Sequence, residues 1–497
     1  MDFVRNFPCI SIMLCLFAGI ISSGLRDKAA MWVNAALLTI NTVLSAYTLI
    51  YTLTLGDSFV YVMGKFPAPW GNEIRAGVLE ALMALFFCII MLLSLFGGRH
   101  KLMEVVEEDK LHLYYVLTDL LLSSLLALVY TNDMFTAYVF VEINTISACG
   151  LIMIRQNGRT IEAAVRYMIM SLLGSGLLLL GLCMLYDLTG HLLMSNIKES
   201  VALIVAEGDY VIPLIVSIVL MSVGLCIKSA LFPFHAWLPD AYGYSTISSA
   251  AMLSSLVSKG YIFLLLKIIY RVIGFEVYDD TRIIDMLFLF GLMGMIFGST
   301  SAIKENDIRR MIAFSSVAQI GYIYMGFGMG TQAGMTASVF HILSHAATKS
   351  LLFIAAIGLT DVSGGSRAFI ELTGSGYRNK WAGVTFTVGS LAMVGVPLFS
   401  GFISKLLFSQ AAVQNHAKML PALIVLGIST ILNAIYFMKT VIRIYTPIDN
   451  SVYSVMTFKD MPVYAIVLLA FIILNVILGI SSQPVVDMIQ QGLATFA

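Results

Sequence analysis

The chain has 497 residues, of which 59% are hydrophobic and 12% charged, and its formal net charge is zero. A soluble domain carries about 25% charged residues, so this composition, with a mean hydropathy of +0.91, indicates an integral membrane protein. The neutral balance argues against a nucleic-acid partner. The six cysteines show no CxxC or Cys/His spacing, so we expect no disulfide, no metal site and no cofactor in this chain.

Fourteen segments are apolar for close to the ~20 residues that a helix needs to cross a bilayer. They cover residues 6–24, 31–55, 77–97, 111–130, 133–154, 163–188, 211–232, 245–271, 284–302, 307–329, 333–360, 381–411, 419–445 and 462–482. Asp2 weakens the basic region that a cleaved signal peptide needs, so we expect the first segment to remain a helix. The sequence predicts an all-α integral membrane protein of about 14 transmembrane helices, without a soluble domain.

Lysine and arginine divide unevenly between the two sets of alternating loops. Seventeen lie in the loops that follow odd-numbered segments, eight lie at the N-terminus and in the other loops, and four lie inside segments. Cytoplasmic loops carry the excess of Lys and Arg. We therefore expect the first set of loops in the cytoplasm and both termini on the outer side.

Several ionisable side chains lie inside the predicted helices. A charge at the bilayer centre costs about 2.5–3.5 kcal/mol on insertion scales, so such groups face the bundle interior and pair with one another. In FHILSHAATKSLLF, residues 340–353, two histidines and a lysine recur at every fourth position and share one helical face. The candidate site residues are Glu142, Lys228, Lys259, His341, His345, Lys349 and Lys405.

For these residues, a purely structural role is an alternative to a role in transport. Lys228 is near the end of its apolar segment and could snorkel to the interface. Glu142 could be a neutral acid held by Asn144 or Thr145, and the histidines could be satisfied core residues. Asp119 is the other acid placed deep in a segment, and a neutral, hydrogen-bonded role explains it, so it is not a candidate. The shared face in residues 340–353 favours a polar track.

Prolines interrupt two segments close to a lysine. LFPFHAWLPDAYGYS places Pro233 and Pro239 just after Lys228, and VGVPLFSGF places Pro397 eight residues before Lys405. Proline bends a helix by removing a backbone hydrogen bond, and broken backbone inside a membrane is tolerated where it lines a cavity. Interruptions in the seventh and twelfth helices predict two inverted five-helix repeats, helices 4–8 and 9–13. The predicted parts are residues 1–110 with helices 1–3, 111–271 and 284–445 with the two repeats, and 446–497 with the last helix.

Four ordered motifs, KSALFPFHAWLPDAY, DIRRMIAFSSVAQIGYI, HILSHAATKSLLF and GVPLFSGFISK, resemble the antiporter-like subunits of respiratory complex I. They are equally similar to Mrp-type Na+/H+ antiporters and to membrane-bound energy-converting hydrogenases. The resemblance covers residues from about 70 to 445. The segment GKFPAPWG, the chain length and the absence of a long C-terminal lateral helix are more similar to the Mrp and hydrogenase branch.

The resemblance assigns roles to the candidate residues. It implies an ion pair between Glu142 of the fifth helix and Lys228 of the seventh, and a proton relay that continues through Lys259, His341, His345, Lys349 and Lys405. The chain also departs from the family pattern: Tyr242 replaces a histidine, STISSAA replaces APTPVSA, and Arg166 stands where a lysine is common. These departures concern the region after the seventh helix and leave the seven candidates in place.

The resemblance implies a proton/cation-translocating membrane subunit of a multisubunit complex in the cytoplasmic membrane of a prokaryote, with no catalytic centre of its own. Its expected partners are lipids and other membrane subunits, including paralogous antiporter-like ones. A peripheral redox module is a further partner that the sequence leaves open. The alternatives are a pumping subunit of NADH:quinone oxidoreductase, a non-conducting scaffold and a solitary solute carrier. The buried charges argue against a non-conducting scaffold, because such a protein does not need them. No cluster of intramembrane carboxylates marks a sodium site, so sodium transport stays open.

Overall fold

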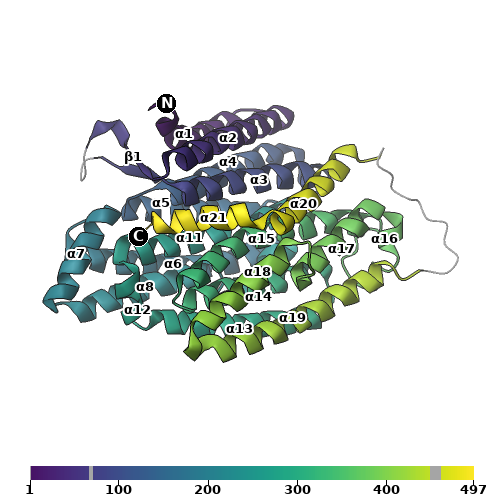
Figure 1. The fold of residues 1–497 in the computed structure, drawn as a ribbon. Coiled ribbons are helices and arrows are strands. Elements are labelled where there is room, and N and C mark those ends of the chain that lie inside the picture. The colour runs from purple at the N-terminus through teal and green to yellow at the C-terminus, as the bar shows by residue number, and fades with distance from the viewer. Residues whose placement is uncertain (1, 67–70, 448–459, 497) are drawn as a thin grey trace.

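The computed structural model describes residues 2–66, 71–447 and 460–496. Four residues of GKFPAPWG, and residues 448–459 of the predicted C-terminal part, lie outside the described residues. The described chain forms a bundle of helices that run mostly side by side (Figure 1). Thirteen of its helices are long and apolar enough to cross a membrane. The remaining predicted span, 381–411, is a pair of half-helices, so the all-helical prediction is confirmed.

The N-terminal part consists of two 3-10 turns, three long helices and a small hairpin. The elements are a 3-10 turn at Asp2–Asn6, α1 at Phe7–Ser23, α2 at Asp27–Leu55, β1 at Phe59–Val62, a 3-10 turn at Met63–Lys65, β2 at Glu73–Ala76 and α3 at Val78–Val105. The antiparallel hairpin pairs Phe59 with Ala76 and Val62 with Glu73. It was not predicted, because four-residue strands give too short a pattern to separate from a loop.

The middle of the chain contains the first broken helix and one fully enclosed span. Its elements are α4 at Glu108–Tyr130, α5 at Met134–Met153, α6 at Gly158–Thr189, α7 at Met194–Glu207, α8 at Val211–Lys228, a 3-10 turn at Phe234–Trp237, α9 at Leu238–Tyr244, α10 at Ile247–Met252, a π segment at Leu253–Val257, α11 at Ser258–Lys267 and a π segment at Ile268–Ile273. Elements α10 to the second π segment form one continuous span that is buried along its whole length.

The second half follows with the same alternation of long helices and short connections. Its elements are α12 at Phe275–Asp280, α13 at Ile283–Lys304, α14 at Ile308–Gly328, α15 at Gln332–Asp361, α16 at Ser375–Arg378, α17 at Lys380–Val394, α18 at Ser400–Gln414, α19 at His416–Ile444, α20 at Pro462–Ile480 and α21 at Ser482–Ala494. In Figure 1 the β hairpin, α7 and α12 lie at one end of the bundle, here called the hairpin end, and α16 lies at the opposite end, the α16 end.

Helix α21 extends the last predicted helix. Gly479, at the end of α20, packs against the backbone of Leu398, and Gly492 in α21 packs against Leu79 at the start of α3. The chain therefore turns after Ile480 and continues along α3 and α15. The sequence did not predict α21, because its polar residues Gln483 and Asp487 end the apolar run.

Both predicted helix interruptions are present. Helix α8 ends at Lys228, and Ala230 has a left-handed φ of +61°. Helix α17 ends at Val394, and both Gly395 and Leu398 have φ +91° before α18 begins. Left-handed backbone is costly for residues with a Cβ and is concentrated at functional sites. The inverted relationship between the two halves and the proposed domain boundaries remain predictions.

Helices α6 and α8 pack with their backbones in contact, which fixes Lys228 in place. A Cβ on Gly174 would lie 2.8 Å from the Gly224 carbonyl oxygen and 3.0 Å from Cγ of Lys228. A Cβ on Gly176, two residues along α6, would meet nothing within 4 Å. Only the first of these glycines is required by packing.

Gly174→Leu is expected to force α6 away from α8, because overpacking a tight contact costs about 1–3 kcal/mol or more. Gly176→Leu is the matched control and should behave as the unaltered chain. Thermal unfolding of the two purified variants in detergent compares them. Equal midpoints for both variants would contradict the described α6–α8 contact.

Candidate functional site

The predicted pair of Glu142 and Lys228 is present in the structure. The Lys228 Nζ lies 3.8 Å from Oε1 of Glu142 and donates a 2.7 Å hydrogen bond to Oγ1 of Thr145. It also lies 5.4 Å above the ring of Tyr261. Lys228 is only 1% exposed, so it does not snorkel. As the last residue of α8, it sits where the helix dipole favours a cation.

A polar network supports this pair from the α4 side. The Tyr261 hydroxyl donates a 3.0 Å hydrogen bond to Oδ1 of Asn144, whose amide donates to Ser124 at 2.8 Å. Asn144 is therefore bonded to its neighbours rather than to Glu142. The Glu142 side chain is 27% exposed at the flank of the chain, so one end of the charged row is open to the surface.

Lys259 is fully buried and is held by the irregular backbone before it. Its Nζ donates to the carbonyl oxygen of Ser254 and, at 3.2 Å, to Oγ of Ser258. Ser254 belongs to the π segment, in which the helical hydrogen-bond pattern is shifted. Single-turn π segments occur frequently at functional sites. Here the irregular turn supplies an oxygen ligand to a buried ammonium group.

Serines connect Lys259 to Lys349 across three helices. The Ser254 hydroxyl lies 3.1 Å from the hydroxyl of Ser316. The adjacent Ser315 accepts a hydrogen bond from Nζ of Lys349, which also donates to the Ile312 carbonyl at 2.9 Å. These serines were not predicted from the sequence, although serine doublets are visible in it at 254–255 and 315–316.

The two histidines of α15 stack on each other, as their spacing predicted. Their ring centroids are 5.9 Å apart and their planes 1° from parallel. His341 Nδ1 lies 2.6 Å from Oγ of Ser404, and its ring stacks on Tyr322. Both ring nitrogens of His345 are buried without a hydrogen-bond partner among the described residues. The ring lies within electrostatic range of Lys259 and Lys349.

Lys405 closes the row at the second broken helix. Its Nζ donates a 2.5 Å hydrogen bond to the carbonyl of Val394, the last residue of α17. Gly395 is needed here, because its φ is +91° and a Cβ would lie 2.9 Å from Cδ of Lys405. Lys405 is half-buried, so the sequence expectation of a deep position is only partly met. The preceding residue, Ser404, contacts His341.

The structure thus places the seven candidates, here called the row, on neighbouring helices of the bundle. An ion pair, serine bridges and stacked imidazoles connect some of them. No direct hydrogen bond among the described side chains joins Lys228 to Lys259, or His345 to either neighbour. Asp119 lies apart, accepting hydrogen bonds from Asn34 and, at 3.3 Å, from Ser22. That placement agrees with the structural role expected for it.

Four further buried charges were not predicted from the sequence: Glu80, Lys267, Arg271 and Arg309, the last of which lines a second cavity described below. Glu80, which was not recognised as a buried acid, forms a 2.5 Å ion pair with Arg271. Lys267 donates to the Leu128 and Val129 carbonyls at 3.2 and 3.0 Å, at the end of α4. The charge count assigned Lys267 and Arg271 to a loop, and this was wrong: both are at most 2% exposed. They lay near the end of an apolar run, where sequence alone does not separate loop from helix.

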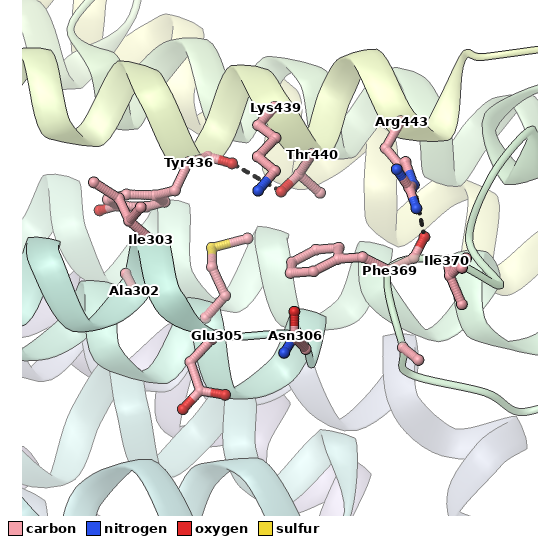
Figure 2. A pocket seen from close by; sticks show the side chains of 12 residues that line it. Ala302, Ile303, Glu305, Asn306, Phe369, Ile370, Tyr436, Lys439, Thr440 and Arg443 are labelled. Atoms are coloured by element: carbon pink, nitrogen blue, oxygen red, sulfur yellow. Dashed lines mark hydrogen bonds between the residues drawn. The ribbon is translucent and has the colours of Figure 1, made fainter.

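A separate cavity of about 300 Å³ opens at the α16 end between α13, α14 and α19 (Figure 2). Figure 2 shows the Lys439 side chain reaching into it, beside Arg443, whose Nε donates to the Phe369 carbonyl at 3.2 Å. Met311 and Tyr436 also line it. Within the described ranges, His, Cys, Asp and Glu nowhere gather in groups of three that could hold a metal ion.

The fold and the buried row define a multi-pass membrane protein with an antiporter-like arrangement of charges. The family model described as "NADH:quinone oxidoreductase/Mrp antiporter, TM" matches residues 131–432, more than half of the chain. The chain belongs to this family.

Two curated relatives match most of the chain. It is 33% identical over 407 residues to "NADH-quinone oxidoreductase subunit N" of Desulforudis audaxviator, covering 80% of this chain and 78% of the relative. It is 28% identical over 467 residues to "Putative antiporter subunit mnhD2" of Staphylococcus aureus, covering 93% of this chain and 90% of the relative.

Two solved structures share the fold. A chain of an archaeal membrane-bound sulfane sulfur reductase superposes with a TM-score of 0.90 and 25% identity. A chain of the Mrp complex from Dietzia sp. superposes with a TM-score of 0.87 and 23% identity. Both superpositions cover 100% of this chain and 98% of the other. The resemblance described from the four motifs is therefore confirmed.

Arg271→Met is expected to destabilise the protein by about 3–5 kcal/mol, because removing one partner of a buried ion pair leaves Glu80 charged and unpaired. Lys110→Met is the control, since Lys110 pairs with the exposed Glu107 and surface pairs contribute about 0–1 kcal/mol. Chemical or thermal unfolding of both variants measures the difference. Equal losses of stability in the two variants would show that the buried Glu80–Arg271 pair contributes no more than the surface pair.

Proposed function

We propose that this chain is a proton/cation-translocating subunit of a multisubunit membrane complex, of the Mrp Na+/H+ antiporter or energy-converting hydrogenase class. The observation that carries the proposal is the row of seven ionisable groups through the interior. A charge buried in a membrane protein is expensive and marks ion pathways by default. The family membership and the named relatives support the same class.

The row can move protons because different interactions stabilise the charged form of each member. Lys228 is stabilised by Glu142, and two unit charges about 4 Å apart attract by about 4 kcal/mol at an effective dielectric of 20. Moving Glu142 away removes that attraction, while burial continues to disfavour the charged amine. Lys228 then becomes a proton donor, and Lys259 is the next acceptor in the row.

Water completes the gaps between these groups. Buried polar atoms are nearly always hydrogen-bonded to protein or to ordered water, and both nitrogens of His345 lack a protein partner among the described residues. Histidine exchanges protons near neutral pH. His345 therefore passes protons through water between Lys259 or Lys349 on one side and His341 on the other. Ser404 carries the path to Lys405.

The cavity of Figure 2 provides an approach from the α16 end. Met311 and Tyr436 line it, and the residues that follow them, Ile312 and Phe437, contact Lys349 through a carbonyl and a ring. The two flank-facing ends, Glu142 and Lys405, are placed to meet neighbouring antiporter-like subunits.

The chain lies in the cytoplasmic membrane of a prokaryote with both termini outside, as its loop charges indicate.

A second candidate is the pumping subunit of NADH:quinone oxidoreductase. The observation that favours it is the relative at 33% identity, which carries that enzyme's name. Both candidates use the same interior row and differ in the energy source. Genes for iron–sulfur subunits beside this one would favour the redox-driven complex, and genes for small Mrp subunits would favour the antiporter.

Lys228→Ala and Glu142→Ala are each expected to lower ion transport at least about tenfold, a loss of 1.4 kcal/mol or more in the limiting step. The whole complex in vesicles, with and without sodium, gives the flux. Asp119→Asn is the control, because Asp119 lies outside the row, and it should transport normally. Normal pumping by either row variant would refute the relay.

Lys405→Glu is expected to retain part of the activity, because a titratable group remains at this position. Lys405→Ala should lose most of it, since no titratable group remains beside the Val394 carbonyl. The same vesicle assay compares the two. If Lys405→Ala transports at the normal rate, Lys405 has no part in the mechanism.

A further inference from the structure

A second polar cavity, of about 150 Å³, lies at the α16 end, away from the charged row. It is enclosed by the ends of α3 and α15, the turn between α5 and α6, the starts of α10 and α14, and the segment around residue 365. Its charged lining residues are all cationic: Lys101, Arg155, Arg309 and Arg367. No carboxylate is among the residues that line it.

Two of the four cations have an acidic partner outside the cavity. Lys101 Nζ lies 2.7 Å from Oδ1 of Asp361. Arg367 Nε lies 3.6 Å from Oδ2 of Asp307, and its Nη1 donates to the Gly243 carbonyl at 2.8 Å. These acidic partners hold the two side chains in place at the edge of the cavity.

The other two cations have no acidic partner among the described residues. Arg309 is 3% exposed and donates from Nη2 to the carbonyls of Ser245, at 2.5 Å, and Tyr242, at 3.2 Å. Its Nε is buried without a hydrogen-bond partner in the described part of the chain. Arg155 has no ion pair or hydrogen bond to any described residue. Burial and the charge of Arg367 hold the pKa of Arg155 below its usual range.

We propose that this cavity binds a phosphate-type oxyanion between Arg155, Arg309 and Arg367. Guanidinium groups match the oxygens of phosphate in planar pairs, and Thr246 in the lining carries a further hydroxyl. The volume is about five times the ~30 Å³ of a water molecule in the liquid, enough for one phosphate group with a few waters. The anion compensates one buried charge, Arg309, and one half-buried charge, Arg155, neither of which has an ion pair among the described residues, and it joins segments from both halves of the chain.

The group has two possible sources, free inorganic phosphate and the headgroup of an anionic phospholipid. The test uses the purified complex in nanodiscs of phosphatidylcholine alone, titrated with inorganic phosphate, and in nanodiscs that also contain phosphatidylglycerol. Thermal unfolding and calorimetric titration report binding. A saturable stabilisation by phosphate in the first nanodisc indicates the free anion. Stabilisation by phosphatidylglycerol, with loss of the phosphate response, indicates the headgroup.

The matched variants are Arg155→Gln and Arg159→Gln. Both residues lie around the α5–α6 turn, but Arg159 is exposed and does not line the cavity. Arg155→Gln should weaken binding about tenfold or more, since a hydrogen bond to a charged group contributes about 1.5–3 kcal/mol, and Arg159→Gln should leave it unchanged. Arg367→Gln is a second variant with the same expected loss. No saturable response in either nanodisc, or equal responses in Arg155→Gln and Arg159→Gln, would overturn the proposal.

Discussion

An ammonium group inside a membrane needs oxygen atoms around it, and this chain supplies them by interrupting its own helices. Lys228 stands at the end of α8, Lys405 bonds the last carbonyl of α17, and Lys259 bonds a carbonyl of a π segment. In a regular helix these carbonyls would be occupied by the next turn. The breaks therefore supply oxygen atoms to Lys259 and Lys405, whereas Lys228 bonds Thr145 of α5 and Lys349 bonds Ile312 of α14.

The buried charges fall into two groups with different partners. Glu80 with Arg271, and Lys267 with the end of α4, are satisfied at close range and hold α3, α4 and the eighth span together. Within the row, Lys259, Lys349 and Lys405 also hydrogen-bond at close range. By contrast, Glu142 and Lys228 are 3.8 Å apart, and His345 bonds no described residue. The proposed relay needs movement or water at these two places.

The sequence predicted the transmembrane helices, both interruptions and the seven members of the row, because apolar length, proline and buried charge are local signals. It did not predict the π segments or the serine bridge from Ser254 to Ser316, since these depend on which helices meet. Lys267 and Arg271 were misplaced because they lie near the end of an apolar run. The hairpin and α21 were missed because one is too short and the other too polar for the pattern that identifies membrane helices.

The central claim is that the interior from Glu142 to Lys405 is one wetted, connected path. A cryo-EM map of the intact complex, at a resolution that shows ordered water, tests it most directly. The account predicts water molecules within hydrogen-bond distance of both nitrogens of His345 and between Lys228 and Lys259. Apolar side chains filling those two gaps, with no density for water, would contradict it.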